Sequence, residues 1–181
     1  MLPGFPEATL PATQAEPRRF AMRVLVVFYS LTGTTRRVAQ AVAAELGADI
    51  EEIRCPNYRP GFFGFWRAGY ASWKNKIPEI APSKCAAADY DLVVVGGPVW
   101  AWNACTPVRA YLMREAACLP ALAFFVTVGG VGFEQALATM ETLAGRKPAA
   151  TLVLKTEDFK RGEDRAGIAS FAAALRRSKA A

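Results

Sequence analysis

Short apolar runs of the kind that form buried strands alternate along this chain with longer segments of helical spacing. The runs cover residues 23–29, 92–95, 121–128 and 151–154, and residues 49–54 are expected to form a short second strand. The helical segments cover residues 35–46, 107–114, 133–143 and 164–178. Continuous apolar runs are typical of strands that are buried on both faces of a sheet. The alternation therefore predicts one α/β domain, a doubly wound parallel sheet of five strands with helices on both faces.

Three of the predicted helices have an apolar stripe that can pack on such a sheet. The stripes consist of Val38, Val42 and Leu46, then of Leu137, Met140 and Leu143, and finally of Ile168, Phe171 and Leu175. Gly47 is expected to end the first helix, since glycine accepts the backbone conformation found after a helix C-terminus. No internal repeat or second domain is visible in the sequence.

Histidine is absent from all 181 residues. Its absence excludes Ser-His-Asp and Cys-His catalysis, His-ligated zinc or haem, and a His phosphorelay. The chain is 52% hydrophobic and 21% charged, a composition typical of a folded protein with a core. Its net charge of +6 is compatible with an anionic partner. Because no nucleic-acid recognition motif accompanies this charge, we expect no nucleic-acid partner.

The cysteines show no C-x-x-C pair; they are Cys55, Cys85, Cys105 and Cys118. This spacing argues against a structural zinc site or a disulfide scaffold, and it indicates a reducing, cytoplasmic location. No metal site is predicted. The longest stretches without charge lie between Asp91 and Arg109 and between Glu115 and Glu134. Each contains breaks at Gly, Pro, Asn or Thr, so we expect no integral membrane segment.

Residues 1–21 show neither strand nor helix periodicity. They contain four prolines with scattered Glu and Arg, and no basic region followed by an apolar core. The segment is therefore not a secretory signal. We expect a disordered tail at 1–21 and a folded domain at 22–181. Met22 lies directly before the first strand, and a true start at Met22 is left open.

The turn after the first predicted strand carries the most informative motif, residues 30–35 with the sequence SLTGTT. It lies between a buried strand and the start of a helix. Hydroxyls and backbone N–H groups in such a turn bind anions, and the helix dipole adds to the attraction. The P-loop and dinucleotide-binding patterns are both absent. A Ser/Thr-rich cap on an ordinary helix is the alternative interpretation.

SLTGTT resembles the phosphate loop of the flavodoxin family, and it follows the first strand as that family's loop does. Residues 96–103 (GGPVWAWN), leading into Pro107, and residues 127–133 (TVGGVGF) are similar to the family's two other ligand loops. The resemblance covers residues 22–179 and includes the three loops in order. It implies the strand order 2-1-3-4-5, of which flavodoxin is the standard example, with the ligand where the order reverses.

The resemblance implies that FMN binds at these three turns. Its phosphate would be held by Ser30, Leu31, Thr32, Gly33, Thr34 and Thr35. Its isoalloxazine ring would lie along Pro98, Val99, Trp100, Ala101, Trp102, Asn103, Thr127, Gly129, Gly130 and Phe133. A flat ring needs aromatic stacking and backbone amides at its polar edge. Trp100 or Trp102 would stack on the ring, Asn103 would bond its pyrimidine edge, and core packing is the alternative for both tryptophans.

Charge sets this chain apart from electron-carrier flavodoxins, which are typically acidic. The chain is basic, and its three ligand turns contain no Asp or Glu. Negative charge beside a flavin opposes further negative charge on its ring, so this opposition is expected to be weaker here. Cys105 lies near the second turn and is interpreted as a small buried side chain rather than a redox thiol.

Residues 60–78 form a segment rich in aromatic and basic side chains. Its aromatic residues with helical spacing are Phe62, Trp66, Tyr70 and Trp73, and the basic residues around them are Arg59, Arg67, Lys74 and Lys76. A helix that covers the sheet is the first interpretation. A wall of a substrate pocket, a dimer contact and a membrane-surface helix are left open.

Two functions are compatible with the sequence. The first is an FMN-dependent oxidoreductase of the quinone-reductase type, which passes electrons from a reduced nicotinamide to a quinone-like acceptor. The flavin carries this chemistry, so no catalytic side chain is predicted. The alternative is a flavodoxin-type protein electron carrier without small-molecule turnover. We expect the enzyme, with a nicotinamide donor and a small-molecule or protein acceptor as partners, and a homodimer is left open.

Overall fold

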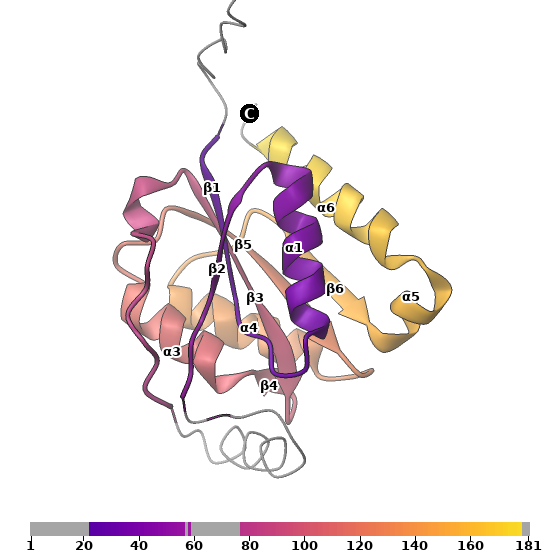
Figure 1. Cartoon of the computed structure of the whole chain (residues 1–181), viewed down its shortest axis with the longest axis horizontal. Helices are drawn as coiled ribbons and strands as arrows, with labels where there is room; N and C mark the ends of the chain where they lie inside the picture. Colours follow the sequence, from indigo (N-terminus) through magenta and orange to yellow (C-terminus); the bar gives the residue numbers. More distant parts are fainter. Residues whose placement is uncertain (1–21, 57, 59–76, 179–181) are drawn as a thin grey trace, which may run out of the picture.

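Parallel strands form the centre of this computed structural model, which describes residues 22–56, 58 and 77–178 (Figure 1). The parallel strands are β1 (Val24–Phe28), β2 (Asp49–Glu52), β3 (Leu92–Trp100), β5 (Ala121–Val128) and β6 (Thr151–Lys155), and β4 (Asn103–Ala104) pairs antiparallel with β3. The helices are α1 (Thr34–Leu46), α3 (Thr106–Glu115), α4 (Phe133–Ala144), α5 (Thr156–Arg161) and α6 (Asp164–Ser178), with a 3-10 turn η1 (Ala87–Asp89).

The order of the parallel strands is β2-β1-β3-β5-β6. This confirms the predicted α/β fold and the predicted order 2-1-3-4-5. The short strand β4 makes a sixth strand, where five were predicted. Strand β1 lies between two neighbours, since Phe28 pairs with Glu52 on one side and with Gly96 on the other. The order therefore reverses at β1, and the connections that leave β1 and β3 run to opposite faces of the sheet.

Two apolar layers hold the helices against the sheet. On one face α1 and α6 pack on the strands, with Val38, Val42, Ile168, Phe171 and Leu175 buried. On the other face α3 and α4 contribute Val108, Leu112, Ala136 and Met140. Figure 1 shows α1 beside α6 on the first face. Burying a side chain of this size stabilises the fold by about 1.5–3 kcal/mol. Of the predicted stripes, Leu46, Leu137 and Leu143 are only half-buried.

Strand β3 differs most from its prediction, which ended it at Val95. The strand continues to Trp100, because Gly96 pairs with Phe125 and Pro98 pairs with Thr127 in the neighbouring β5. Glycine and proline usually mark a turn. Here Gly96 makes room for a neighbour, since a methyl group in its place would overlap the Phe125 ring.

Some predictions fall outside the described part of the chain. The tail at 1–21 and residues 60–76 of the aromatic-basic segment lie there, so their predicted roles are not addressed by the structure. Within the described ranges, every helix is too short or too polar to cross a membrane.

Replacing Gly96 with alanine should destabilise the fold by about 1–3 kcal/mol, because the added methyl group overpacks the core against Phe125. Gly129→Ala is the matched control, since among the described residues no heavy atom lies within 4 Å of a methyl group there. That variant should change the free energy of unfolding by no more than about 0.5 kcal/mol. Urea unfolding followed by circular dichroism measures both values, and equal stabilities would contradict the packing argument.

Candidate functional site

The three predicted ligand turns lie at one edge of the sheet. They follow β1, β3 and β5, which are neighbours and run parallel. Their carboxyl ends therefore meet at the same edge, the lower one in Figure 1, where β4 also lies. The structure thus brings together three segments that are far apart in the sequence.

The first turn presents the start of α1 to solvent. The Ser30 Oγ accepts a hydrogen bond from the N–H of Gly33 at 3.1 Å, and Gly33 has a φ of 93°. No side chain of the described residues caps the helix, and its first turn contains no acidic residue. The first N–H groups of an α-helix have no acceptor within the helix. The start of α1 therefore offers hydrogen-bond donors and a positive dipole end to an anion, beside the exposed Thr32 and the half-buried Thr34.

A buried contact joins the first turn to the end of β5. The Oγ1 atoms of Thr35 and Thr127 lie 2.8 Å apart, and the two residues are 2% and 6% exposed. Both residues were predicted as site residues, but this bond between them was not. Because it spans the edge from α1 to β5, it holds the first and third turns in a fixed relation.

The second turn is a tight hairpin between β3 and β4. Its two central residues, Ala101 and Trp102, have φ values of 47° and 59°. Non-glycine residues seldom adopt this left-handed conformation, and two in succession are typical of a two-residue hairpin turn. Asn103 accepts the N–H of Ala104 through Oδ1 at 2.8 Å. Its side-chain amide nitrogen can still donate hydrogen bonds at this edge.

The two tryptophans of the hairpin have different environments. Trp100 is 7% exposed and packs edge-to-face against Tyr29 and Tyr58, with ring centroids 5.6 and 5.5 Å apart. Trp102 is 65% exposed. Its backbone and ring pack on Gly132, where a methyl group would come within 2.7 Å of the Trp102 Cα and Cδ1 atoms. The indole of Trp102 is therefore the accessible aromatic surface of this turn, and Tyr29 and Tyr58 are partners that the sequence did not reveal.

The third turn contains two glycines at positions where the fold would also accommodate a side chain. At Gly129 and Gly130, a methyl group in place of the hydrogen would have no heavy atom of the described residues within 4 Å, and neither residue has a left-handed φ. A side chain at either position would extend into open space at this edge. Phe133 begins α4 directly after the turn and is half-buried.

The three turns, residues 30–36, 98–106 and 127–133, contain no carboxylate. Arg36 beside the first turn is paired with Glu52 on β2 at 2.7 Å. The Lys155 ammonium lies 5.2 Å from the centroid of the Phe133 ring and takes part in none of the ion pairs found among the described residues. Sequence reasoning missed Lys155, although its place at the end of β6, paired with Val128, puts it at the same edge.

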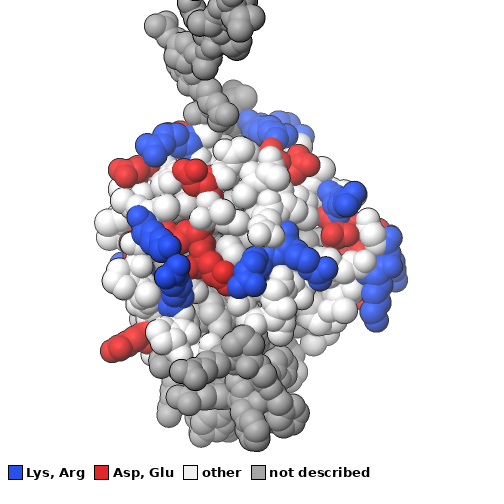
Figure 2. Space-filling model, in the orientation of Figure 1, with Lys and Arg blue, Asp and Glu red and all other residues white. Residues whose placement is uncertain are grey.

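Charge on the described part of the face shown in Figure 2 is mixed. Figure 2 shows basic and acidic side chains interspersed over the face in view, without a continuous patch of one sign. The described residues on that face therefore form no single large basic patch.

Cys105 is fully buried behind the second turn, with no exposed surface. Burial raises the pKa of its thiol to about 12. The thiol stays protonated at neutral pH, and a protonated, inaccessible thiol is a poor nucleophile and redox group. This agrees with its interpretation as a packing residue.

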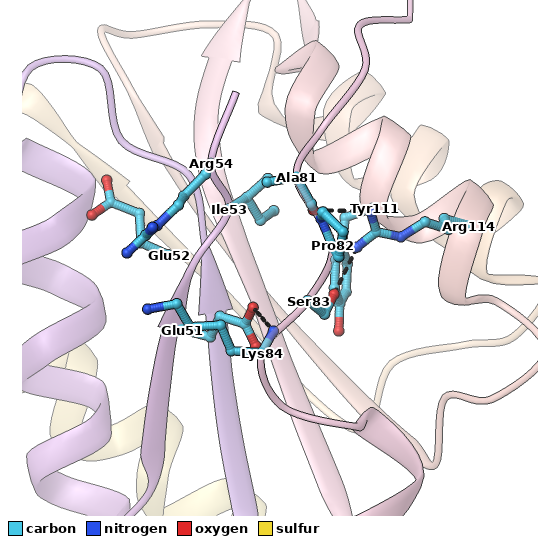
Figure 3. Close-up of a pocket in the computed structure, with 10 residues that line it drawn as sticks. All are labelled: Glu51, Glu52, Ile53, Arg54, Ala81, Pro82, Ser83, Lys84, Tyr111 and Arg114. Carbon is cyan, nitrogen blue, oxygen red and sulfur yellow. Dashed lines mark hydrogen bonds between the residues drawn. The ribbon is translucent and has the colours of Figure 1, made fainter. Parts of the chain in front are cut away.

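A pocket of about 80 Å³ lies away from these turns, beside β2 (Figure 3). Several of its polar groups already take part in hydrogen bonds within the protein. The Glu51 carboxylate accepts the N–H groups of Lys84 and Cys85 at 2.7 and 3.0 Å. Arg114 donates to the Ala81 carbonyl and the Ser83 hydroxyl at 3.0 and 2.6 Å. The Glu51 bonds tie the segment before η1 to the edge strand β2, and the Arg114 bonds tie it to α3. None of the predicted site residues lines this pocket.

Comparison with known proteins agrees with this geometry. A flavoprotein from Lactobacillus acidophilus NCFM, solved in complex with FMN, superposes with a TM-score of 0.65 at 20% identity, over 78% of this chain and 98% of that one. A flavodoxin, WrbA-like protein from Agrobacterium tumefaciens gives a TM-score of 0.54 at 15% identity, over 87% and 99%. At these identities the similarity shows the fold.

A curated relative is similar in sequence over a shorter stretch. The NAD(P)H dehydrogenase (quinone) of Archaeoglobus fulgidus is 31% identical over 80 residues, which is 42% of this chain and 42% of the relative. The match therefore spans less than half of that protein.

The sequence model of the flavodoxin family matches residues 23–155, which include all three ligand turns. The match covers most of the chain. It agrees with the strand order of the parallel sheet and with the three turns that meet at one edge. This protein belongs to the flavodoxin family.

Proposed function

We propose that this protein is an FMN-dependent oxidoreductase that passes electrons from NADH or NADPH to a quinone-like acceptor. The observation that carries the proposal is the edge where three turns from neighbouring strands meet with open glycines, free helix N–H groups and no carboxylate. When bound, FMN supplies the chemistry: it accepts a hydride or electrons from one substrate and gives them to another.

The residues at this edge fit FMN. A phosphate needs several hydrogen-bond donors and a positive field, which the uncapped start of α1 and the hydroxyls of Thr32 and Thr34 supply. A flat ring needs backbone that it can approach closely. Gly129 and Gly130 leave this space open, although neither their backbone conformation nor their packing against the described residues demands glycine there. A cofactor bound closely at this edge would account for glycine at both positions.

The second turn would hold the ring from the other side. Trp102 offers an exposed indole that is kept in place by Gly132, whereas Trp100 is enclosed by Tyr29 and Tyr58. We therefore assign stacking to Trp102 and structural support to Trp100. Asn103, whose Oδ1 already accepts a backbone N–H, would donate to the polar edge of the ring through its amide nitrogen.

The charges around the edge favour two-electron chemistry. Reduction adds negative charge to a flavin, and a unit charge at about 4 Å is worth about 4 kcal/mol at an effective dielectric constant of about 20. The turns contain no carboxylate to oppose this charge, and the Lys155 ammonium beside Phe133 would favour it. With no histidine in the chain and the Cys105 thiol held protonated, the protein's part is anchoring, stacking and electrostatics.

The identity of the substrates is supported by similarity to the Archaeoglobus fulgidus relative, whose name gives NAD(P)H and quinone. A protein electron carrier is the second candidate. The observation that favours it is the apolar rim of the edge, where Trp102 and Val131 are 65% and 70% exposed and would suit contact with a protein partner.

Substitution of the two tryptophans should separate their roles. Trp100→Ala should destabilise the protein by about 3–5 kcal/mol, because it empties a buried aromatic site. Trp102→Ala should change stability by no more than about 0.5 kcal/mol. It should weaken FMN binding by about 2- to 12-fold, since stacking is worth about 0.5–1.5 kcal/mol, and it should restore flavin fluorescence. If Trp102→Ala keeps FMN quenched and equally tightly bound, the stacking assignment is wrong.

Steady-state kinetics test the proposed function. The FMN-loaded protein should oxidise NADH or NADPH in the presence of a quinone, with a turnover number of about 1 s⁻¹ or more, the lower end of the usual range for enzymes. Free FMN at the same concentration and the protein without FMN are the controls. A rate no higher than that of free FMN with both nicotinamides would favour the electron carrier.

A further inference from the structure

Thr35 and Thr127 form a buried pair whose hydrogen bonding is incomplete. Their Oγ1 atoms lie 2.8 Å apart, and the side chains come from positions 92 residues apart in the chain. Thr35 is 2% exposed and Thr127 is 6% exposed, so solvent has little access to either hydroxyl. Thr35 lies in the first turn of α1, and Thr127 lies one residue before the end of β5.

The pair has one more O–H proton than its own bond uses. Each threonine hydroxyl carries one such proton. The bond between the two oxygens uses one of them, and the other needs an acceptor. Among the described residues no second bond is formed by either hydroxyl. A buried O–H without an acceptor is unfavourable, so the site favours a ligand that supplies one.

We propose that Thr127 is a positioning residue for FMN: its O–H donates to Thr35, which directs the Thr35 O–H toward the phosphate. This inference rests on the proposed FMN site. The direction of the two bonds follows from the place of each residue. Thr35 belongs to the first turn of α1, whose free N–H groups would surround the expected anion, whereas Thr127 belongs to β5. A hydroxyl that accepts one hydrogen bond becomes a stronger donor of the next.

Thr127 also connects the turn proposed for the phosphate with the turn proposed for the ring. Thr127 is followed by Val128, Gly129 and Gly130, so the residue that orients Thr35 also begins the turn proposed for the ring. The phosphate and the ring would therefore be bound by connected elements. Riboflavin, which lacks the phosphate, would not use the Thr127–Thr35 pair.

The test measures dissociation constants for FMN and for riboflavin by fluorescence titration, in wild type, Thr127→Val, Thr127→Ser and Thr156→Val. Valine keeps the shape of threonine and removes the hydroxyl, and serine keeps the hydroxyl. Thr156→Val is the matched control: its hydroxyl lies at the same edge and donates to the Val128 carbonyl at 3.4 Å, without contact to Thr35. We expect Thr127→Val to weaken FMN by about tenfold, in line with loss of one charge-assisted hydrogen bond. Riboflavin affinity should stay unchanged, Thr127→Ser should restore FMN binding, and Thr156→Val should match wild type.

A double-mutant cycle with Thr35→Val distinguishes positioning from packing. If Thr127 acts through Thr35, then Thr127→Val should have no further effect on FMN binding in a Thr35→Val background. Losses that add, or equal losses for FMN and riboflavin, would overturn the proposal and leave Thr127 a packing residue. Wild-type protein that does not distinguish FMN from riboflavin would overturn the proposed phosphate site itself, and the positioning role with it.

Discussion

The parallel pairing of β1, β3 and β5 is the constraint on which the rest of this structure depends. It brings the carboxyl ends of three strands to one edge, so that turns separated by many residues become neighbours. Side-chain contacts then fix their relative positions. Thr35 and Thr127 join the first turn to the third, and Trp102 packs on Gly132 to join the second to the third. A site held by such contacts can keep its geometry before a ligand arrives, which lowers the free-energy cost of binding.

Electrostatics at this edge distinguish the protein from an acidic electron carrier. The turns lack carboxylates, and Arg36 is paired with Glu52 on β2. The nearby positive charge is instead Lys155, which reaches Phe133 from the end of β6. The burial of Cys105 and the absence of histidine leave few side chains that titrate near neutral pH. We therefore expect the protein to act on a bound flavin mainly through fixed charge and packing.

The fold was predictable because periodicity and burial are local signals, and strand β5 and helix α6 have the predicted bounds. The extension of β3 through Gly96 and Pro98 was not predictable from the sequence, since it depends on the Phe125 ring in a neighbouring strand. The motifs located the three turns, but they could not tell Trp100 from Trp102. That difference arises from Tyr29 and Tyr58, which approach Trp100 only in the folded chain. The Thr35–Thr127 bond and Lys155 were missed for the same reason, as long-range contacts leave no sequence pattern.

An edge without carboxylates is expected to tune bound FMN for two-electron transfer, and the proposed function depends on this tuning. A spectroelectrochemical titration of the FMN-loaded protein tests it most directly. Since the turns hold no negative charge to oppose the second electron, the flavin should be reduced in what is close to a single two-electron transition. Two well-separated one-electron steps, the second at a very low potential, would contradict this tuning and indicate a one-electron carrier.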